Sequence, residues 1–261
     1  MSPGLVHWSF DPVLVRVGHL QLRAYTVCFV LAFLATYWLM RGLFVREGKP
    51  VRELDLMAIP LLISAAIGAR LVHCLAYHPA YYLAHPMQIW AFDRGGLASH
   101  GGALAIVTAY LWSRRPNSPS FLWLLDRLAI AGLPGVALIR AGNFANSEML
   151  GVPTGSGWGI VFDRIDTVAR HPVQLYEALA YLVSWLILRR TYRAQGDRMP
   201  AGGYLAQALV WVGTARFVLE FFKDQGGSPL AAGGFSVGQW LSLPMIAIGW
   251  MMQRRRVSGA A

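Results

Sequence analysis

Seven apolar segments, each long enough to form most or all of a membrane-crossing helix, constrain this chain more than any other feature of its sequence. A helix rises about 1.5 Å per residue, so about 20 apolar residues cross the roughly 30 Å hydrocarbon core of a bilayer. Charged residues make up 14% of the chain, against about a quarter in an ordinary soluble domain. The sequence therefore predicts an all-α membrane protein with seven transmembrane helices. The expected spans are residues 24–44, 56–77, 95–113, 121–139, 172–188, 201–222 and 235–253.

Two further segments are unsuited to crossing a bilayer. Residues 78–93 are short and contain prolines, tyrosines and a tryptophan, which is typical of an interfacial or re-entrant segment. Residues 141–171 are polar and rich in glycine, so they are expected to form a small extracytoplasmic lobe between spans four and five. The sequence thus predicts one polytopic membrane domain over residues 1–261, with residues 141–171 inserted as a head.

The positive charges orient the predicted helices. The chain has a formal net charge of +10, and more than half of its 23 lysines and arginines follow spans one, three, five and seven. Loops rich in lysine and arginine stay in the cytoplasm. We therefore expect the amino terminus and the lobe outside, and the carboxyl terminus in the cytoplasm. The same charges attract anionic membrane lipid, so no nucleic-acid partner is needed to explain them.

The densest group of polar side chains follows the fourth apolar segment, in Arg140-Ala-Gly-Asn-Phe-Ala-Asn-Ser-Glu-Met-Leu-Gly151. Polar groups at the end of a membrane helix are costly unless a ligand or partner uses them, and glycine allows backbone to approach a ligand closely. The alternative is a polar turn whose asparagines cap the helix. Residues of this stretch expected to contact a substrate are Arg140, Asn143, Asn146, Glu148 and Gly151.

Polar residues from six of the seven predicted spans lie at one depth, toward the outer leaflet. Some begin spans that run inward and the others end spans that run outward, and a shared depth favours one common site. Several arginines at headgroup depth indicate a phosphate ligand. The residues at this depth are Tyr25, Arg70, His100, Arg140, Tyr176, Glu177, Arg216 and Glu220.

Several of these residues also have a purely structural interpretation. Arg216 and Glu220 are four residues apart and could pair with each other on one helix face. Arg70 could bond backbone carbonyls, and His100 could occupy a tight helix start before two glycines. Tyr25 could be an ordinary interfacial aromatic residue.

Five shorter motifs accompany the 140–151 stretch. They are Gly68-Ala-Arg70, Ser99-His-Gly-Gly102, His171-Pro-Val-Gln-Leu-Tyr-Glu177, Arg216-Phe-Val-Leu-Glu-Phe-Phe222 and Gly238-Gln-Trp-Leu-Ser-Leu-Pro244. In this combination and order the chain resembles the prolipoprotein diacylglyceryl transferase family, membrane enzymes that lipidate bacterial lipoprotein precursors. One departure is Leu150-Gly-Val152, where the family often has Trp-Gly-Arg, so this chain lacks an arginine at that position.

The resemblance implies a seven-span fold with an extracytoplasmic head in the cytoplasmic (inner) membrane. It implies phosphatidylglycerol as the donor and the lipobox cysteine of a prolipoprotein signal peptide as the acceptor. The diacylglyceryl group would move to the cysteine thiol as a thioether, with release of glycerol phosphate. Family roles fall on Tyr25, His100, Arg140, Asn143, Gly151 and Arg216, with Glu220 supporting Arg216. Arg70 and Tyr176 are further expected substrate contacts.

The expected chemistry needs a base and an anion clamp. A thiol has an unperturbed pKa of about 8.5, so a base near neutrality helps to form the thiolate. His100 is the candidate base, with Tyr25 as the alternative. Arg140 and Arg216 would bind the phosphate and stabilise its developing charge. The histidines show no paired metal-ligand spacing, and neither metal nor cofactor is expected. Cys28 and Cys74 are expected to be packing residues.

A lipid or solute transporter and a structural membrane scaffold are the two competing classes. Embedded arginines also line transport paths, but transporters often contain internal repeats, and the 140–151 stretch has no second copy. A scaffold explains the apolar segments but leaves the shared polar depth unexplained.

Overall fold

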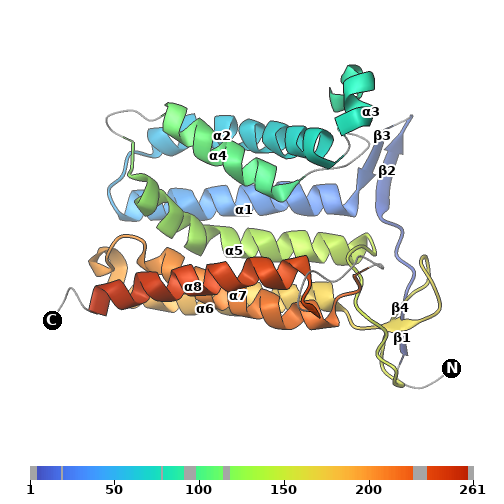
Figure 1. Ribbon diagram of the computed structural model, residues 1–261. Coiled ribbons are helices and arrows are strands. Elements are labelled where there is room, and N and C mark those ends of the chain that lie inside the picture. The colour runs from blue at the N-terminus through green and yellow to red at the C-terminus, as the bar shows by residue number, and fades with distance from the viewer. Residues whose placement is uncertain are drawn as a thin grey trace. The chain divides into compact units, whose positions relative to one another are not determined.

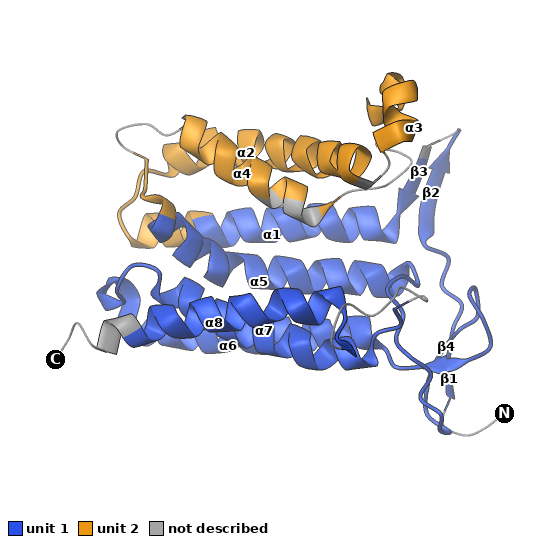
Figure 2. Cartoon of the chain, in the orientation of Figure 1, with its two compact units in different colours: residues 1–40, 122–261 blue, residues 41–121 orange. Residues whose placement is uncertain are grey.

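The computed structural model describes residues 5–18, 20–77, 79–90, 98–113, 118–225 and 234–257, and these are mostly helical (Figure 1). The chain divides into two compact units (Figure 2). Unit 1 comprises residues 1–40 and 122–261, and unit 2 comprises residues 41–121. The single polytopic domain expected from the sequence stays a prediction.

Unit 1 contains the polar 140–151 stretch and, in its described residues, five helices that follow from long apolar runs. Helix α6 packs against α7 and α7 against α8. Helix α5 approaches α1 closely, because a Cβ atom added at Gly135 would lie 2.8 Å from the Ala32 carbonyl oxygen. The helices are α1 (Ala24–Arg46, which continues into unit 2), α5 (Phe121–Ala145), α6 (Val173–Gln195), α7 (Gly203–Leu219) and α8 (Val237–Val257).

Unit 2 is a helical pair with a short irregular connection. Helix α2 (Val51–Val72) runs into a π-helical turn, η1 (His73–Tyr77), and packs against α4 (Ser99–Ser113). Between them lie α3 (Pro79–Ala84) and the 3₁₀ helix η2 (Pro86–Trp90). These short elements fall within the segment predicted to be interfacial. Tyr81, Leu83, Met87 and Trp90 are exposed there.

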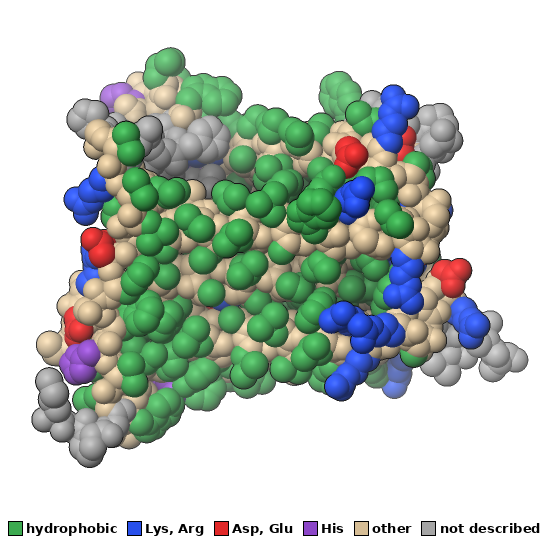
Figure 3. All heavy atoms as spheres, turned by 180° about the vertical axis from the view of Figure 1, so that it is seen from behind, with side chains coloured by type: hydrophobic (Ala, Val, Ile, Leu, Met, Phe, Trp, Pro, Cys, Tyr) green, Lys and Arg blue, Asp and Glu red, His purple; other side chains and the backbone are tan. Residues whose placement is uncertain are grey.

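Each long helix in the described residues falls on one predicted span, so the helix positions read from hydropathy are confirmed. By length and composition, four helical segments of the described chain could cross a membrane: Ala24–Arg46, Val51–Ala76, Phe121–Ala145 and Gly203–Phe222. Helix α4 has 15 residues, or about 22 Å of rise. The space-filling view shows hydrophobic side chains spread over the helices on that face, with lysines and arginines toward helix ends (Figure 3). The chain is a helical membrane protein on these grounds.

The expected helical character is confirmed, but the described residues also contain short strands, which the expectation of an all-α protein did not include. In unit 1, β1 (Leu5–Trp8) pairs parallel with β4 (Gly159–Phe162), and β4 pairs antiparallel with β5 (Ala169–Arg170). A separate hairpin joins β2 (Val13–Val17) to β3 (Leu20–Arg23). The head therefore combines residues from the amino terminus with residues from the predicted insertion. Strands this short give almost no periodic signal, which is why hydropathy did not reveal them.

Candidate functional site

Helix α5 carries the first half of the 140–151 stretch. The helix continues through Ala145, so residues 141–145 are helical and the lobe begins later than the sequence suggested. Gly142 faces α1 so closely that an added Cβ would lie 2.9 Å from Cys28 Cβ and 3.2 Å from Tyr25 Cα. The Tyr25 backbone N–H donates to Asn146 Oδ1 at 3.4 Å. The start of α1 is therefore fixed against this stretch.

Two asparagine amides hold the carboxylate of Glu148. Asn143 Nδ2 donates to Oε2 at 3.2 Å, and Asn146 Nδ2 donates to Oε1 at 3.0 Å. Gln174 Nε2 of α6 donates to the Glu148 carbonyl at 2.6 Å. The turn between is strained, because Ser147 and Met149 have φ angles of 55° and 57°, which are uncommon for residues other than glycine. Side chains of the stretch thus bond mainly to one another, and this gives a preorganised polar surface.

Arg140 is held by neighbours on two helices and keeps donors available. Its Nε atom lies 2.9 Å from Glu177 Oε2 of α6. Among the described residues the Nε–H group has no hydrogen-bond partner, so this contact is an ion pair without hydrogen-bond alignment. Its Nη1 atom donates to Asn143 Oδ1 at 3.3 Å. No hydrogen bond is formed by Nη2 within the described residues. A planar guanidinium with a free edge is suited to an anion.

Gly151 closes the stretch against His171, which lies two residues before the start of α6. A Cβ atom there would collide with the carbonyl oxygen of His171 and lie 2.8 Å from Val173 Cγ2. The close approach that glycine permits is therefore to the protein's own backbone. On its other side the stretch bonds to the segment after α7, with Val152 N–H donating to Phe222 O at 2.9 Å and Asp224 N–H to Leu150 O at 2.9 Å.

Arg170 gathers the same segments through its guanidinium. Nη2 donates to Asp166 Oδ2 at 2.6 Å, Nη1 donates to Asp224 Oδ2 at 2.8 Å, and Nη1 also donates to the Gly151 carbonyl at 3.1 Å. The hydrogen bond from Arg170 holds the pKa of Asp166 below its usual value, and the Asp166 carboxylate raises the pKa of Arg170. Arg170 is thus a structural latch of the head, because its guanidinium is engaged by groups of the protein itself.

Arg216 and Glu220 of the α7 end do not pair with each other in the structure. Glu220 Oε1 accepts from Ser236 Oγ at 3.1 Å and from Gln225 Nε2 at 3.2 Å, and Lys223 Nζ lies 3.8 Å from Oε2. The half-buried Arg216 forms no hydrogen bond or ion pair with any described residue. Its guanidinium, like the free edge of Arg140, is therefore available to a ligand.

Tyr176 lies in an aromatic cluster of the head. Its hydroxyl is 3.3 Å from Nδ1 of His171, and the His171 ring contacts Trp158 and Phe222 edge-on. This cluster packs beside Gly151, where the 140–151 stretch ends. The role of Tyr176 as a substrate contact stays a prediction.

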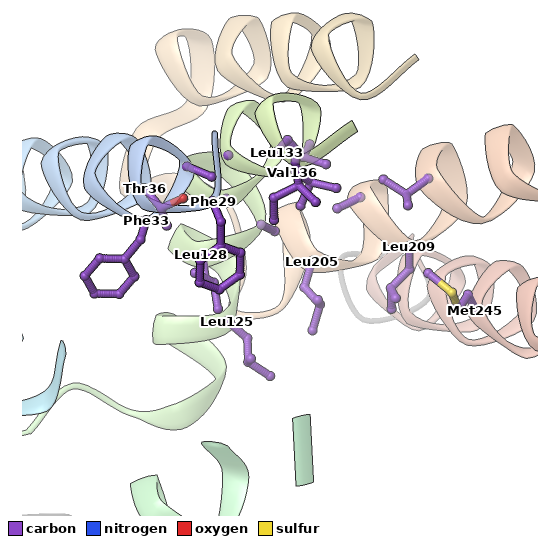
Figure 4. A pocket seen from close by; sticks show the side chains of 17 residues that line it. Phe29, Phe33, Thr36, Leu125, Leu128, Leu133, Val136, Leu205, Leu209 and Met245 are labelled. Atoms are coloured by element: carbon purple, nitrogen blue, oxygen red, sulfur yellow. The ribbon is translucent and has the colours of Figure 1, made fainter. Parts of the chain in front are cut away.

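An apolar pocket of about 480 Å³ lies between α1, α5, α7 and α8. Figure 4 shows Phe29, Leu128, Leu209 and Met245 around it. Thr36 supplies the one polar side chain among its lining residues. The lining begins at Ile139, next to Arg140, and ends near the opposite end of α5 at Leu125. That length corresponds to about 21 Å of helix.

Unit 2 carries the two remaining candidate residues, Arg70 and His100. Arg70 is 1% exposed, and its Nε and Nη2 donate to the carbonyls of Ile89 and Gln88, each at 2.8 Å. These contacts favour the structural interpretation, in which Arg70 ties η2 to the end of α2. The residue after His100 must be small, because a Cβ atom at Gly101 would collide with the Gly68 carbonyl oxygen. This explains the glycine in the Ser99-His-Gly-Gly102 motif. The backbones of α2 and α4 are therefore in contact at the position next to His100 in the chain.

Asp126 is a buried charge with a structural role that the sequence did not reveal. Asp126 of α5 is fully buried, and its carboxylate accepts from the backbone N–H groups of Gly202 at 2.6 Å and Leu205 at 2.8 Å. It caps the start of α7 from another helix. A single sequence carries no signal for such a long-range partner. Cys28 and Cys74 are free thiols, half-buried and buried respectively.

Comparison with known proteins matches most of the chain to one family. The family model described as "Prolipoprotein diacylglyceryl transferase" matches residues 12–254. A phosphatidylglycerol–prolipoprotein diacylglyceryl transferase of Tolumonas auensis is 42% identical over 246 residues, covering 94% of this chain and 95% of the relative. The proteins of that name from Chloroherpeton thalassium and Geobacter sulfurreducens are 41% and 38% identical, covering 95% of this chain and 92% and 97% of their own lengths. The chain belongs to the prolipoprotein diacylglyceryl transferase family.

Proposed function

We propose that this chain transfers the diacylglyceryl group of phosphatidylglycerol to the thiol of the lipobox cysteine of a prolipoprotein signal peptide. A thioether forms and glycerol phosphate leaves. The relatives carry this activity in their name. The observation that supports it most in the structure is the availability of two guanidiniums, Arg140 Nη2 and Arg216, on helix ends that the head joins together.

The donor lipid fits the chemistry of unit 1. Its phosphate would bind the free edge of Arg140 together with Arg216, because guanidinium recognises phosphate oxygens in a bidentate manner. The Asn143–Glu148–Asn146 network would bond the headgroup hydroxyls. One acyl chain would occupy the apolar pocket that starts beside Arg140, since an alkyl chain needs no polar partner there.

The reaction forms one bond and breaks one. The cysteine thiolate attacks the glycerol methylene of the donor, a sulfur–carbon bond forms, and the carbon–oxygen bond to phosphate breaks. The bonding electrons leave with glycerol phosphate, whose charge Arg140 and Arg216 stabilise. The thiol proton passes to His100 as the candidate base. Tyr25 is the alternative base, although its ordinary pKa near 10 makes it a weaker one.

We place the chain in the bacterial inner membrane with seven spans, the amino terminus and head outside, and the carboxyl terminus in the cytoplasm. The loop charges support this orientation. Single cysteines at Gly155 and Gln195, in a chain without Cys28 and Cys74, should react with impermeant reagents from opposite sides. Labelling of the cysteine at position 195 from outside intact cells, with position 155 silent, would invert the topology.

The activity itself is tested with purified protein, phosphatidylglycerol and a lipobox peptide, with mass spectrometry of the peptide. A transferase adds the diacylglyceryl mass, whereas a transporter or scaffold leaves the peptide unchanged. Arg140→Lys keeps the positive charge but loses the planar guanidinium that binds phosphate in a bidentate manner, so turnover should fall strongly. Arg193→Lys, at the exposed end of α6, should not change turnover. Near-normal turnover in Arg140→Lys would reduce its role to that of a generic positive charge.

The base is tested by pH. His100→Gln should lower turnover by about 10²–10⁴-fold, the usual contribution of a positioned base. The deficit should shrink as pH rises toward the pKa of the thiol, because free thiolate then forms without help. The loss in Arg140→Lys should not recover in this way. A deficit of His100→Gln that stays constant with pH would favour Tyr25 as the proton acceptor.

A further inference from the structure

The β2–β3 hairpin of unit 1 has one apolar face and one mainly polar face. The register pairs Val15 with Leu22 and Arg16 with Gln21, after an irregularity between Val13 and Val15. Directly opposed residues share a face and successive residues alternate between faces. Val15, Val17 and Leu22 therefore share one face. The opposite face carries Arg16, Gln21 and Arg23, together with Val13, which is directly opposed to Arg23.

The apolar face is uncovered. Val15, Val17 and Leu22 are 49%, 68% and 42% exposed, and the three polar residues are exposed as well. A two-stranded hairpin is marginally stable in water, and it normally needs its apolar face packed against another element. Three branched aliphatic side chains on one small face therefore call for a second, apolar surface.

The position of the hairpin indicates what that surface is. Arg23 is followed directly by α1, which is long and apolar enough to cross a membrane. The Ala24 N–H donates to the Pro12 carbonyl at 2.8 Å, and this bond fixes the base of the hairpin at the helix start. In Figure 1 the two strands run across the axis of α1 instead of continuing along it. A helix that crosses the bilayer would thus place the hairpin along the membrane surface.

We propose that the β2–β3 hairpin lies in the lipid–water interface, with Val15, Val17 and Leu22 in the upper acyl region and Arg16, Gln21 and Arg23 among the headgroups. Partitioning at the interface suits an element with one apolar and one basic face. Basic side chains at this depth are attracted to anionic phospholipid, and long arginine side chains reach the headgroups from an apolar base.

This placement has a consequence for Tyr25. That residue lies two positions after Arg23, and its backbone bonds the 140–151 stretch through Asn146. A hairpin held in the interface fixes the height of the α1 start relative to the headgroups. It would therefore keep Tyr25 at the depth of phospholipid phosphates independently of any bound substrate.

Spin labels on the two faces test the proposal without measuring lipid transfer, so its outcome is separate from that of the proposed function. In a Cys28→Ser, Cys74→Ala chain, Val17→Cys and Gln21→Cys supply matched positions on opposite faces of the hairpin. The protein is placed in vesicles of phosphatidylcholine and phosphatidylglycerol. Relaxation by oxygen, which concentrates in the bilayer, is compared with relaxation by a water-soluble nickel chelate. The ratio of oxygen to nickel accessibility should be several-fold higher at position 17 than at position 21.

Two outcomes would overturn the proposal. Equal, high nickel accessibility at both positions would show that the hairpin stands in water. Nickel exposure at position 17 that disappears only when a lipobox peptide is added would make the apolar face a peptide-docking surface. Repeating the measurement with Val15→Cys and Arg16→Cys guards against disturbance by one label, because this second pair must show the same difference between faces.

Discussion

Arg170 Nη1 donates to Asp224 Oδ2 at 2.8 Å, and this pair joins the end of β5 to the segment that follows α7. The same guanidinium bonds Gly151 at the end of the 140–151 stretch. The ends of α5 and α7 are thereby connected through one side chain. Because those helices carry Arg140 and Arg216, the latch in the head fixes the two guanidiniums proposed to share one phosphate.

Removal of the latch should weaken donor binding. Arg170→Ala leaves two carboxylates without their cation and loses charge-assisted hydrogen bonds, which contribute about 1.5–3 kcal/mol each. We expect the KM for phosphatidylglycerol to rise about tenfold, which corresponds to about 1.4 kcal/mol, and Arg170→Lys to recover part of it. Arg164→Ala removes an exposed ion pair with Asp11, worth at most about 1 kcal/mol, and serves as the control. Equal KM values in Arg170→Ala and Arg164→Ala would contradict the role of the latch.

The latch should also make the head sensitive to acid. The hydrogen bond from Arg170 lowers the pKa of Asp166 in the folded head, whereas the unfolded chain has the ordinary value near 3.9. A depressed folded pKa stabilises the head fully above that ordinary value, and the stabilisation is lost as pH falls through the folded pKa. Amide hydrogen exchange of residues 159–170 should therefore accelerate below about pH 4, after correction for the intrinsic rate. In Asp166→Asn this step should be smaller, and an undiminished step would assign the effect to another group.

The sequence predicted the long helices well because each one follows from local composition. Apolar runs such as residues 121–139 determine a membrane helix without reference to the rest of the chain. The sequence also placed Tyr25 and Glu177 near the 140–151 stretch, and the structure shows Tyr25 bonded to Asn146 and Glu177 paired with Arg140. The common depth of these residues in the membrane stays a prediction.

Long-range pairing could not be predicted in the same way. In the sequence, Asp126 is one charge near the start of an apolar segment. Only the fold shows that its carboxylate caps α7. Glu220 has a matching arginine four residues earlier, but it bonds Ser236 from a distant segment instead. Gly151 was expected to approach a ligand, whereas the structure shows it against the His171 backbone. Such partners are set by tertiary packing, which local patterns do not contain.

The glycine beside His100 offers a test within unit 2. A Cβ at Gly101 would lie 2.6 Å from Val72 Cβ and would collide with the Gly68 carbonyl, so Gly101→Ala must push α4 away from α2. We expect overpacking to cost about 1–3 kcal/mol and turnover to fall with the displacement of His100. Gly42→Ala adds a methyl group in α1 where no atom of the described part of the chain lies within 4 Å, and should be neutral or slightly stabilising. Thermal unfolding and turnover of both variants, measured in the same detergent, decide between these expectations.

Asp126 should contribute to the stability of the fold and should not affect substrate binding. In Asp126→Asn the carboxylate that accepts from Gly202 and Leu205 becomes neutral, and a buried charge-assisted cap is weakened. We expect a loss of about 2–4 kcal/mol in the free energy of unfolding, with the KM for phosphatidylglycerol unchanged in the folded fraction. Asp197→Asn, at an exposed site between α6 and α7, is the control and should have little effect. A change in KM with unaltered stability would place Asp126 in the substrate path.

The ion pair between Glu177 and Arg140 should affect substrate binding and turnover in different ways. Glu177 Oε2 lies 2.9 Å from Arg140 Nε, so the carboxylate both orients the guanidinium and competes with a phosphate for its charge. Glu177→Gln keeps the size of the side chain and removes the charge. Phosphate should then bind Arg140 more tightly in the ground state, while a less fixed guanidinium stabilises the transition state less well.

We therefore expect both the KM for phosphatidylglycerol and kcat to fall in Glu177→Gln, with kcat reduced about tenfold, or about 1.4 kcal/mol. That pattern marks an interaction that restrains the ground state. Glu53→Gln on α2, whose carboxylate accepts from Ser118 Oγ at 3.3 Å, is the matched control and should leave both constants unchanged. Glu177→Ala would leave Arg140 buried and unpaired at a cost of about 3–5 kcal/mol, so the glutamine variant is the informative one. Unchanged kcat and KM in Glu177→Gln would show that the pair only holds α5 against α6.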